Sequence, residues 1–347
     1  MKYLLYPFSV IYFLITSLRN FLFDHSLFFF KPQKFDVYTV CVGNLSVGGT
    51  GKTPFIEYLV RLLADKYKVA TLSRGYGRRT KGIIVATKES TALEIGDEPA
   101  QFLHKFHPKI HVVVGEERTI AIPHLLSRFA ETQVILLDDA FQHRKVSADF
   151  NIVLTDYHKL FFKDFLLPMG RLRESRTGIN RANAIVVTKC PEDISYKMEY
   201  IRKKIQPYIA KEGIPIFFTS IKYGNPISID PENSKFDSTN KIVLVTGIAN
   251  AAPLKKYVSK YLKLFSHLEF GDHHQYSGLD FEKIISKFKL IKSPQKCILT
   301  TEKDMMKWLD EHTRQLLTNI PVFYIPIEMH FIENEPQFQS LVLKGLK

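Results

Sequence analysis

The sequence predicts an α/β protein of two lobes, built on a doubly wound, mostly parallel sheet. From Val37 onward, short β-branched runs alternate with stretches of helical periodicity, which is the pattern of repeated βαβ units. A glycine-rich segment lies between the first of these runs and the helical stretch that follows it. The length of 347 residues exceeds what one hydrophobic core usually supports, so a second, smaller α/β lobe is expected.

The apolar runs of the first lobe give its expected strands along the chain. Helices are expected near residues 53–66, 97–106 and 116–130, because parallel neighbours in a sheet need a crossover connection. The expected strands lie at residues 37–42, 69–72, 83–86, 110–114, 134–137, 152–154 and 184–187.

A polar stretch at residues 223–240, with Gly224, Pro226 and Pro231, predicts a linker or an exposed excursion. It divides a first lobe at residues 31–222 from a second lobe at residues 241–347. The second lobe has expected strands at 241–245, 264–270, 297–299 and 322–325, again separated by helical patterns.

The charge balance favours polyanionic partners. Lysine and arginine number 48 against 35 aspartate and glutamate, which gives a net charge of +13. The lysines are spread along helix faces, and no basic run is interleaved with aromatics, so nucleic acid is not an expected partner. The cysteines, Cys41, Cys190 and Cys297, are odd in number and form no CxxC pair, which argues against a disulfide framework and a zinc site.

The N-terminal region, residues 1–30, is unusually apolar. Residues 3–18 carry no charged side chain, but this run is shorter than the ~20 residues that cross a bilayer. Arg19, Asp24 and His25 interrupt the phenylalanine-rich stretch that follows. We expect a hydrophobic helix that dips into one leaflet of a membrane. A helix packed on the protein's own core is the alternative, and a cleaved signal peptide is disfavoured because no small-residue cleavage site follows.

The glycine-rich segment, residues 46–53, predicts a phosphate-binding loop. Glycines allow successive backbone N–H groups to face phosphate oxygens, and the N-terminus of the next helix adds partial positive charge. Lys52 would reach the β- and γ-phosphates, and Thr53 would ligate Mg²⁺. Ser46 stands where the usual pattern has its first glycine. The loop consists of Ser46, Val47, Gly48, Gly49, Thr50, Gly51, Lys52 and Thr53.

Two carboxylates end the apolar run at residues 134–137. Asp138 and Asp139 have the placement of a Walker B strand, which aims carboxylate oxygens at Mg²⁺ near the phosphate loop. Together with the loop they predict a P-loop NTPase-type core that binds a nucleoside triphosphate and Mg²⁺, in which at least one of the two aspartates is functional.

Two further acidic motifs are candidates for acid–base chemistry. Asp97 stands in Gly96-Asp97-Glu98-Pro99 at the start of a predicted helix, and His273 follows Gly271-Asp272 beyond an extended run. On spacing alone, each is also compatible with a helix cap or a turn.

In their order along the chain, these motifs resemble those of the tetraacyldisaccharide 4′-kinases, also called lipid A 4′-kinases. The resemblance covers nearly the whole chain. The matching segments are Gly43-Asn44-Leu45-Ser46-Val47-Gly48-Gly49-Thr50-Gly51-Lys52-Thr53-Pro54, Ser73-Arg74-Gly75-Tyr76-Gly77, Gly96-Asp97-Glu98-Pro99, Asp138-Asp139-Ala140-Phe141-Gln142-His143, Leu166-Leu167-Pro168-Met169-Gly170-Arg171-Leu172-Arg173-Glu174, Thr246-Gly247-Ile248-Ala249, Phe270-Gly271-Asp272-His273-His274 and Thr301-Glu302-Lys303-Asp304.

The resemblance implies a lipid kinase at the cytoplasmic face of the bacterial inner membrane. It would transfer the γ-phosphate of ATP to the 4′-hydroxyl of a tetraacylated glucosamine disaccharide 1-phosphate, giving lipid IVA for lipid A and lipopolysaccharide. Its expected partners are this lipid precursor and the anionic membrane surface, with no nucleic acid and no obligate protein partner.

The resemblance also implies roles for individual residues. Asp97 would help to activate the acceptor hydroxyl, with His273 rather than the neighbouring His274 as its hydrogen-bonding partner. Lys52 and Asp139 would act at the phosphates. The implied metal ligands are Thr53, Asp138 and Asp139, and the implied substrate contacts are Gln142, His143, Arg171 and Glu174, with Arg74 either meeting the substrate's phosphate or lying as a solvated loop charge.

Because Asp97 and His273 lie on opposite sides of the predicted linker, we expect lobe closure to assemble the pair and expel water. The chain departs from the family pattern at Ala140 and Phe141, where Gly-Leu is common, and at Arg171, where proline is common. These changes bear on local loop shape.

Two other nucleotide-binding classes are weaker alternatives. A GTP-binding switch needs an Asn/Thr-Lys-x-Asp motif, but Thr188-Lys189-Cys190-Pro191 has proline in place of the aspartate. A partitioning-type ATPase would carry its signature lysine where this chain has Val47.

Overall fold

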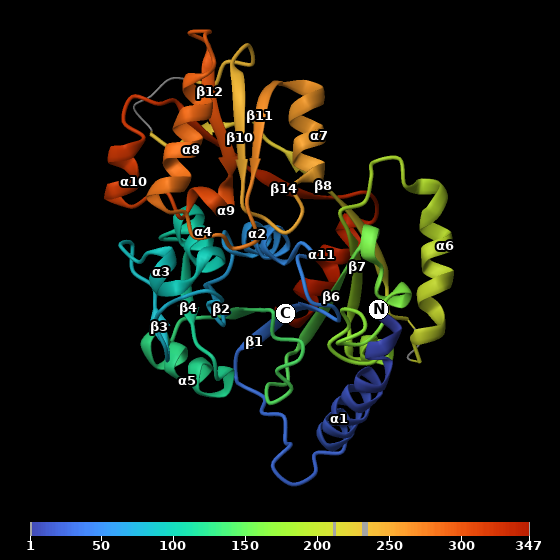
Figure 1. Cartoon of the computed structure of the whole chain (residues 1–347). Coiled ribbons are helices and arrows are strands. Elements are labelled where there is room, and N and C mark those ends of the chain that lie inside the picture. The colour runs from blue at the N-terminus through green and yellow to red at the C-terminus, as the bar shows by residue number, and fades with distance from the viewer. Residues whose placement is uncertain (1, 211–212, 231–234, 347) are drawn as a thin grey trace.

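The computed structural model describes residues 2–210, 213–230 and 235–346, which form two lobes, one above the other in Figure 1. The first lobe is built on a nine-stranded sheet in the order β14-β8-β7-β6-β1-β5-β2-β4-β3. Among these strands only β3 and β14 run antiparallel to their neighbours, so the mostly parallel sheet is confirmed. The strands are β1 Tyr38–Asn44, β2 Val69–Ser73, β3 Ile84–Val85, β4 Ile110–Val114, β5 Val134–Asp138, β6 Phe150–Asp156, β7 Ala184–Thr188, β8 Ile216–Tyr223 and β14 Ile327–Phe331.

Helices cover both faces of this sheet. Successive residues of a strand point to opposite faces, so Val40 and Val42 of β1 join one apolar cluster and Cys41 joins the other. Helices α2, α4 and α11 pack on the first face, and α5 and α6 pack on the second. The helices of this lobe are α1 Tyr6–Asp24, α2 Lys52–Leu63, α3 Ala92–Ile95, α4 Asp97–Phe106, α5 Arg118–Arg128, α6 Ser195–Ile205 and α11 Glu335–Leu343.

The central strand β1 lies between β5 and β6, with Val42 paired to Asp138 on one side and to Ile152 on the other. The chain therefore leaves β1 in one direction and later returns to its other side. In open α/β sheets, the crevice at the carboxyl ends of strands at such a switch point is where ligands bind. Both the glycine-rich loop after β1 and the aspartates after β5 lie at this edge.

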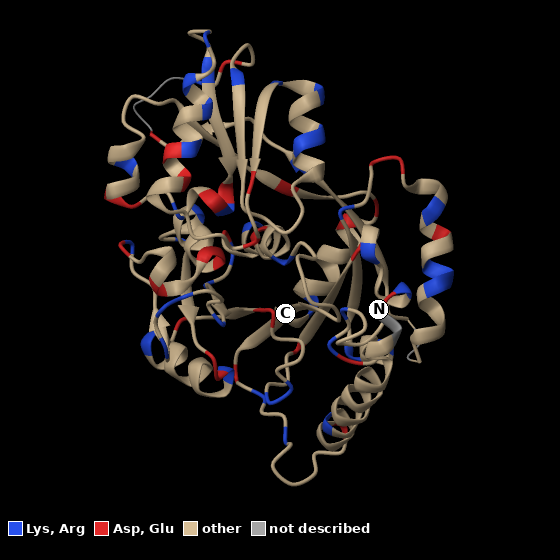
Figure 2. Ribbon diagram, in the orientation of Figure 1, with Lys and Arg blue, Asp and Glu red and all other residues tan. Residues whose placement is uncertain are grey.

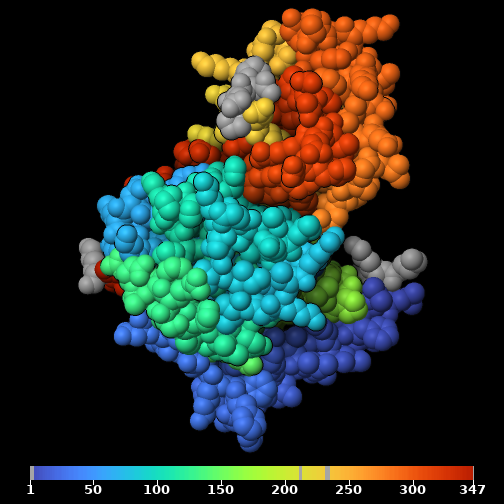
Figure 3. All heavy atoms as spheres, turned by 90° about the vertical axis from the view of Figure 1, so that its left-hand side faces the viewer, coloured from blue at the N-terminus to red at the C-terminus, as the bar shows by residue number. Residues whose placement is uncertain are grey.

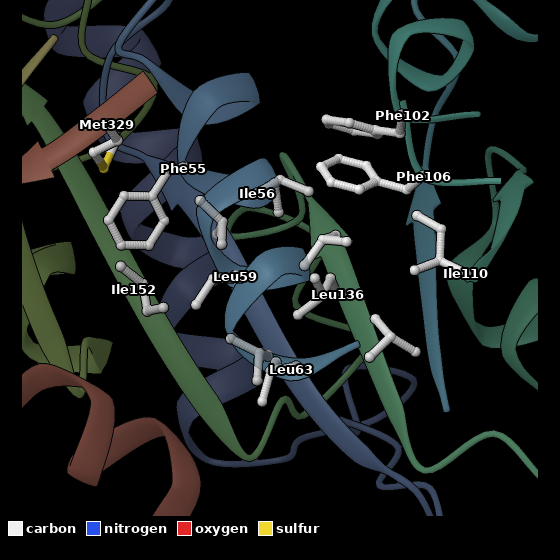
Figure 4. Close-up of a cluster of buried hydrophobic side chains, with 14 of the residues drawn as sticks. Phe55, Ile56, Leu59, Leu63, Phe102, Phe106, Ile110, Leu136, Ile152 and Met329 are labelled. Carbon is white, nitrogen blue, oxygen red and sulfur yellow. The ribbon is translucent and has the colours of Figure 1, made fainter. Parts of the chain in front are cut away.

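Helix α2 is fixed by apolar residues spaced for one face. Ile56, Leu59 and Leu63 are fully buried and face Leu136 and Ile152 of the sheet (Figure 4). Burying each of these side chains contributes about 1.5–3 kcal/mol, and Leu59→Ala would cost about 2–5 kcal/mol. The start of α2, which carries Lys52 and Thr53, is therefore held rigidly against the sheet.

The second lobe has its own five-stranded sheet, in the order β11-β10-β12-β13-β9. Its core includes the fully buried Trp308, whose ring lies 5.5 Å from that of Phe281. The strands are β9 Ile227–Ser228, β10 Lys241–Thr246, β11 Lys263–Glu269, β12 Lys296–Thr301 and β13 Val322–Ile325, and the helices are α7 Ala252–Tyr261, α8 Gly278–Lys289, α9 Glu302–Met305 and α10 Glu311–Leu316.

The C-terminal segment returns to the first lobe, which corrects the predicted second lobe at residues 241–347. Strand β14 pairs antiparallel with β8, a strand that the sequence reading omitted. The ring of Phe338 in α11 lies 5.6 Å from that of Phe55 in α2, within the first core. The second lobe is thus an insertion between β8 and β14. Its two connections meet where the Gly224 amide donates to the Pro326 carbonyl at 2.9 Å.

The predicted linker at residues 223–240 is only partly irregular. It contains β9, which pairs antiparallel with β13 of the second sheet. Residues 231–234 of this predicted linker lie outside the described residues.

Helix α1 turns its polar side chains toward the protein and its apolar side chains toward solvent. Ser9 Oγ donates to the Leu166 carbonyl at 3.1 Å, and Tyr12 Oη donates to the Arg173 carbonyl at 2.9 Å. Figure 2 shows the helix almost free of charged residues. Its exposed large side chains are Tyr6, Phe8, Val10, Ile11, Phe13, Leu14, Ile15, Leu18 and Phe21.

This arrangement reverses the usual polarity of a surface helix, and it exposes an apolar patch continued by Phe28 and Phe29. The alternative in which the apolar face packs on the protein's own core is therefore wrong. None of the helices in the described residues has both the length and the apolar character to cross a membrane.

Candidate active site

The glycine-rich loop, residues 46–53, is held from two sides at the end of β1. Asn44 Nδ2 donates to Thr50 Oγ1 at 2.7 Å, and Thr188 Oγ1, at the end of β7, donates to the Thr50 carbonyl at 2.7 Å. Lys189 Nζ donates to the Gly49 carbonyl. Gly51 has φ +86°, a left-handed conformation that favours glycine, and it leads directly into α2. The first N–H groups of α2 thus lie beyond the carboxyl end of β1.

Asp139 is held by two cations. Its carboxylate lies 3.6 Å from Lys52 Nζ and 3.2 Å from the Arg173 guanidinium. Burial alone would raise the pKa of Asp139, but the charges of Lys52 and Arg173 outweigh it and keep the pKa below its ordinary value. Asp139 also has φ +50°, a conformation costly for most side chains and tolerated by aspartate. The structure therefore brings Lys52 and Asp139 together as an ionised pair.

Asp138 has the opposite electrostatics. Its side chain is buried, and in the described residues its Oδ1 has no hydrogen-bond partner. Burial, with the nearby charge of Glu98 adding to it, raises the pKa of Asp138 to about 7. Thr53 Oγ1 donates to Glu98 Oε1 at 3.3 Å, so Glu98 links the start of α4 to the start of α2.

The described residues contain no group of three or more histidine, cysteine, aspartate or glutamate side chains arranged for a metal ion. The predicted set, Thr53, Asp138 and Asp139, has only two such side chains and a hydroxyl.

The structure brings Asp97 and His273 into contact across the two lobes. His273 Nδ1 lies 3.1 Å from Asp97 Oδ2, and the ring of Tyr76 stands 4.9 Å from the imidazole. His273 has φ +57° in the loop that follows β11. His274 points elsewhere, with its Nε2 3.1 Å from Asp280 Oδ2, so the choice of His273 over His274 agrees with the geometry.

Two lysines of the second lobe complete this cluster. Lys303 Nζ lies 3.0 Å from His273 Nε2, and Lys307 Nζ lies 3.2 Å from Asp97 Oδ2. An ammonium group can only donate, so His273 Nε2 accepts and Nδ1–H donates to Asp97, with the imidazole neutral. Burial would raise the pKa of Asp97, but the hydrogen bond from His273 and the charges of Lys307 and Lys303 outweigh it and lower that pKa.

The predicted substrate contacts fall into two groups. Glu174 has 0% of its side chain exposed and accepts hydrogen bonds from Gln142, Arg181 and Asn20. A sugar therefore cannot reach Glu174, which corrects its implied role as a substrate contact. Glu174 orients Gln142 instead. Gln142 Nε2 also donates to the Asn44 carbonyl at 2.7 Å, just before the glycine-rich loop.

The remaining candidates lie nearer the surface. Arg74 is exposed, and Arg171 is half-buried with its Nε 2.8 Å from Asp164 Oδ2. His143 is half-buried, and burial, with the charge of Arg118 adding to it, lowers its pKa. Arg171 also accepts from the Val47 amide through its carbonyl at 2.8 Å, which ties its segment to the glycine-rich loop.

Sequence reasoning missed Glu98, Arg118, Arg173, Lys303 and Lys307 as site residues. Arg118 is buried behind Asp138 and donates to its carbonyl at 3.3 Å. A signal was available for the lysines, because residues three to four apart share one face of a helical turn beside the Thr301-Glu302-Lys303-Asp304 motif. No periodicity indicated that this turn meets α4.

Known proteins match this chain over its whole length. The family described as tetraacyldisaccharide-1-P 4′-kinase matches residues 1–347. A tetraacyldisaccharide 4′-kinase of Flavobacterium johnsoniae is 45% identical, over 100% of this chain and 98% of its own length. One of Bacteroides thetaiotaomicron is 43% identical, over 95% of this chain and 89% of its own.

A solved structure agrees with the fold. The crystal structure of LpxK from Aquifex aeolicus in complex with ATP has a TM-score of 0.76 to this chain and 30% sequence identity, and the match covers 99% of this chain and 98% of that one. The shared fold includes the large, mostly parallel sheet. The order of motifs, the full-length relatives and this structural match together show that the chain belongs to the tetraacyldisaccharide-1-P 4′-kinase family.

Proposed function

We propose that this member of the family transfers the γ-phosphate of ATP to the 4′-hydroxyl of a tetraacylated glucosamine disaccharide 1-phosphate. The observation that carries the proposal is the placement of two groups at the adjoining starts of α2 and α4, which Thr53 and Glu98 link. A lysine and an aspartate stand beside a glycine-rich loop, and a second aspartate is held by a histidine from the other lobe. Phosphoryl transfer needs donor and acceptor aligned and the charge on the equatorial oxygens neutralised.

In this proposal the glycine-rich loop binds the triphosphate. Its backbone N–H groups and the start of α2 provide donors and partial positive charge, and Lys52 adds a full charge. Asp139 holds the Lys52 ammonium in place until a phosphate replaces it as the partner. The bonds from Asn44, Thr188 and Lys189 keep the loop open, so its shape need not form during binding.

Mg²⁺ fits the oxygen atoms present. Asp138 offers a buried carboxylate oxygen without a partner in the described residues, and Thr53 offers a hydroxyl at the start of α2. Hard divalent cations prefer such oxygens. When bound, Mg²⁺ would neutralise charge on the phosphate oxygens. Thr53 and Asp138 would hold it, while Asp139 pairs with the cations Lys52 and Arg173.

Asp97 serves as the base for the acceptor hydroxyl in this mechanism. Its lowered pKa keeps it ionised at neutral pH, and His273 fixes one of its oxygens. A correctly placed base contributes about 10²–10⁴ in rate. Arg74, Gln142, His143 and Arg171 are proposed to line the path of the sugar and its existing phosphate, and Glu174 positions Gln142.

The enzyme is proposed to work at the cytoplasmic face of the inner membrane. The acyl chains stay in the bilayer, because removing them would cost about 0.8 kcal/mol per CH₂ group. The outward face of α1 would enter the lipid, supported by the exposed Phe28 and Phe29. Lys31 is exposed and suited to anionic headgroups, whereas Lys34 is already 3.1 Å from Asp149.

An acceptor-dependent labelling assay tests the proposal. The purified full-length protein would be incubated with γ-labelled ATP and Mg²⁺, with or without the disaccharide 1-phosphate in detergent. We expect label in the glycolipid only when the acceptor is present, and more with ATP than with GTP. ATP hydrolysis that is indifferent to the acceptor would overturn the proposal.

A further inference from the structure

Lys307 is a buried lysine that joins the two lobes at Asp97. It follows α9, and only 4% of its side chain is exposed. Its Nζ lies 3.2 Å from Asp97 Oδ2 and 3.8 Å from Asp304 Oδ1, and it donates to the His274 carbonyl at 3.0 Å. A buried ammonium group is costly unless it is paired in this way. A buried lysine does not contribute to solubility, so the position of Lys307 needs another explanation.

Lobe attachment alone does not provide that explanation. A second lysine, the half-buried Lys105, already bridges the lobes, with its Nζ 2.7 Å from Glu57 Oε2 and 2.8 Å from Glu302 Oε2. Asp97 and Lys105 lie on one face of α4, which packs against α9. In Figure 3 the cyan surface near residue 100 abuts the red-orange surface of the second lobe. Lys307 stands at the end of this contact where the reaction would occur.

We propose that Lys307 is a positioning residue for Asp97, an inference that rests on the proposed role of Asp97 as the base. Lys307 and His273 both contact Oδ2 of Asp97, so neither occupies Oδ1. The acceptor proton passes to Oδ1 as the acceptor oxygen forms its bond to the γ-phosphorus. The bond from that phosphorus to the bridging oxygen of ATP breaks, ADP leaves, and Asp97 later returns the proton to water.

Among the charged groups around Asp97, Lys307 is the one whose removal should most affect the ionised carboxylate. Lys303 contacts His273 Nε2 rather than Asp97, so its charge acts on Asp97 without direct contact. Asp304 and Tyr276 also face the cluster, and Glu98 follows Asp97 in α4. Lys307 is the cation in direct contact with the Asp97 carboxylate in the described part of the chain. Removing it leaves a buried carboxylate whose ionised form is destabilised.

The test compares Lys307→Met with Lys307→Arg, which keeps the charge. For Lys307→Met we expect kcat at neutral pH to fall at least about tenfold, with KM for ATP within about twofold. The acidic limb of kcat/KM should move to higher pH by about one unit or more, because the base now ionises later. Lys307→Arg should keep the acidic limb near its original pH. An unmoved limb in Lys307→Met overturns the inference.

Two further variants keep the result unambiguous. Lys105→Met removes the other lysine that bridges the lobes, and it should lower thermal stability without moving the acidic limb. If Lys307→Met does not fold, the double variant Lys307→Met/Asp304→Asn, which also removes the second carboxylate that loses its cation, is measured in its place.

Asp97→Asn separates this inference from the proposed function. An active Asp97→Asn variant would refute the base itself. An inactive Asp97→Asn variant beside an unmoved limb in Lys307→Met would refute only the role of Lys307.

Discussion

His273 Nδ1 lies 3.1 Å from Asp97 Oδ2, although 176 positions separate the two residues and they belong to different lobes. The pair therefore exists only while the lobes are in contact. We expect His273→Ala to lower kcat by at least about 10²-fold and to leave ATP binding unchanged, because the imidazole orients the base and does not touch the glycine-rich loop. Turnover together with ATP affinity measured by titration checks this. Undiminished turnover would contradict it.

The raised pKa of Asp138 predicts a pH-dependent affinity for Mg²⁺ with nucleotide. Below a pH of about 7 the carboxyl group is protonated, and a protonated oxygen is a poor metal ligand. The affinity for Mg²⁺ with a non-hydrolysable ATP analogue should therefore rise as pH rises through about 7, with release of a proton. Calorimetry in buffers of different ionisation enthalpy measures this proton. Asp138→Asn should abolish the pH dependence, and its persistence would refute the assignment.

The buried interlobe cluster predicts how stability depends on pH. Burial, with the charge of Glu57 adding to it, raises the pKa of Glu302. A carboxyl group with a raised folded-state pKa loses stabilising free energy as pH rises through that value, by at most about 1.4 kcal/mol per unit. Glu302→Gln should therefore flatten the fall in unfolding free energy with rising pH. Denaturant unfolding at several pH values measures it.

The matched control is Glu328→Gln, because the Glu328 side chain is 65% exposed. That variant should follow the wild-type pH dependence. Equal slopes for Glu302→Gln and the wild type would argue against the raised pKa.

The outward face of α1 predicts lipid binding. Leu14 and Leu18 are both exposed, and burying one leucine contributes about 1.5–3 kcal/mol. Leu14→Ser/Leu18→Ser should weaken binding to anionic vesicles at least about tenfold in a sedimentation assay. Tyr12→Phe changes the inward face and should bind like the wild type, although it loses the bond to the Arg173 carbonyl. Equal binding by the double variant would show that α1 is not the docking element.

Local pattern was enough to predict seven of the nine strands of the first sheet, and the positions of the glycine-rich loop and the two aspartates at strand ends. The run at 134–137 ends in Asp138 and Asp139, and the structure places both at the switch point beside Lys52. The return of β14 and α11 was not predictable in this way, because a short strand next to Pro326 carries no sign of which sheet it joins. The sheet that β14 joins is determined by its pairing with β8 and by the burial of Phe338 beside Phe55. Both are long-range contacts.

The same limit explains the missed site residues. Glu174 and Arg173 are neighbours in sequence, yet one is enclosed by three donors and the other reaches Asp139. Lys307 lies well beyond the motif that contains His273, and only the packing of α9 on α4 brings it to Asp97. Residue type predicted a role in the site only where the residue stood in a recognisable local motif. Residues that reach the site through long-range packing carry no such motif.

The most direct test of the account is to measure phosphate transfer by the Lys52→Ala variant and to compare it with transfer by Lys52→Arg. We expect glycolipid labelling from γ-labelled ATP to fall by at least about 10²-fold in Lys52→Ala, because the ammonium paired with Asp139 is the full charge that the glycine-rich loop offers to the triphosphate. Lys52→Arg should recover part of the loss. Glycolipid labelling by Lys52→Ala at the wild-type rate would contradict the account.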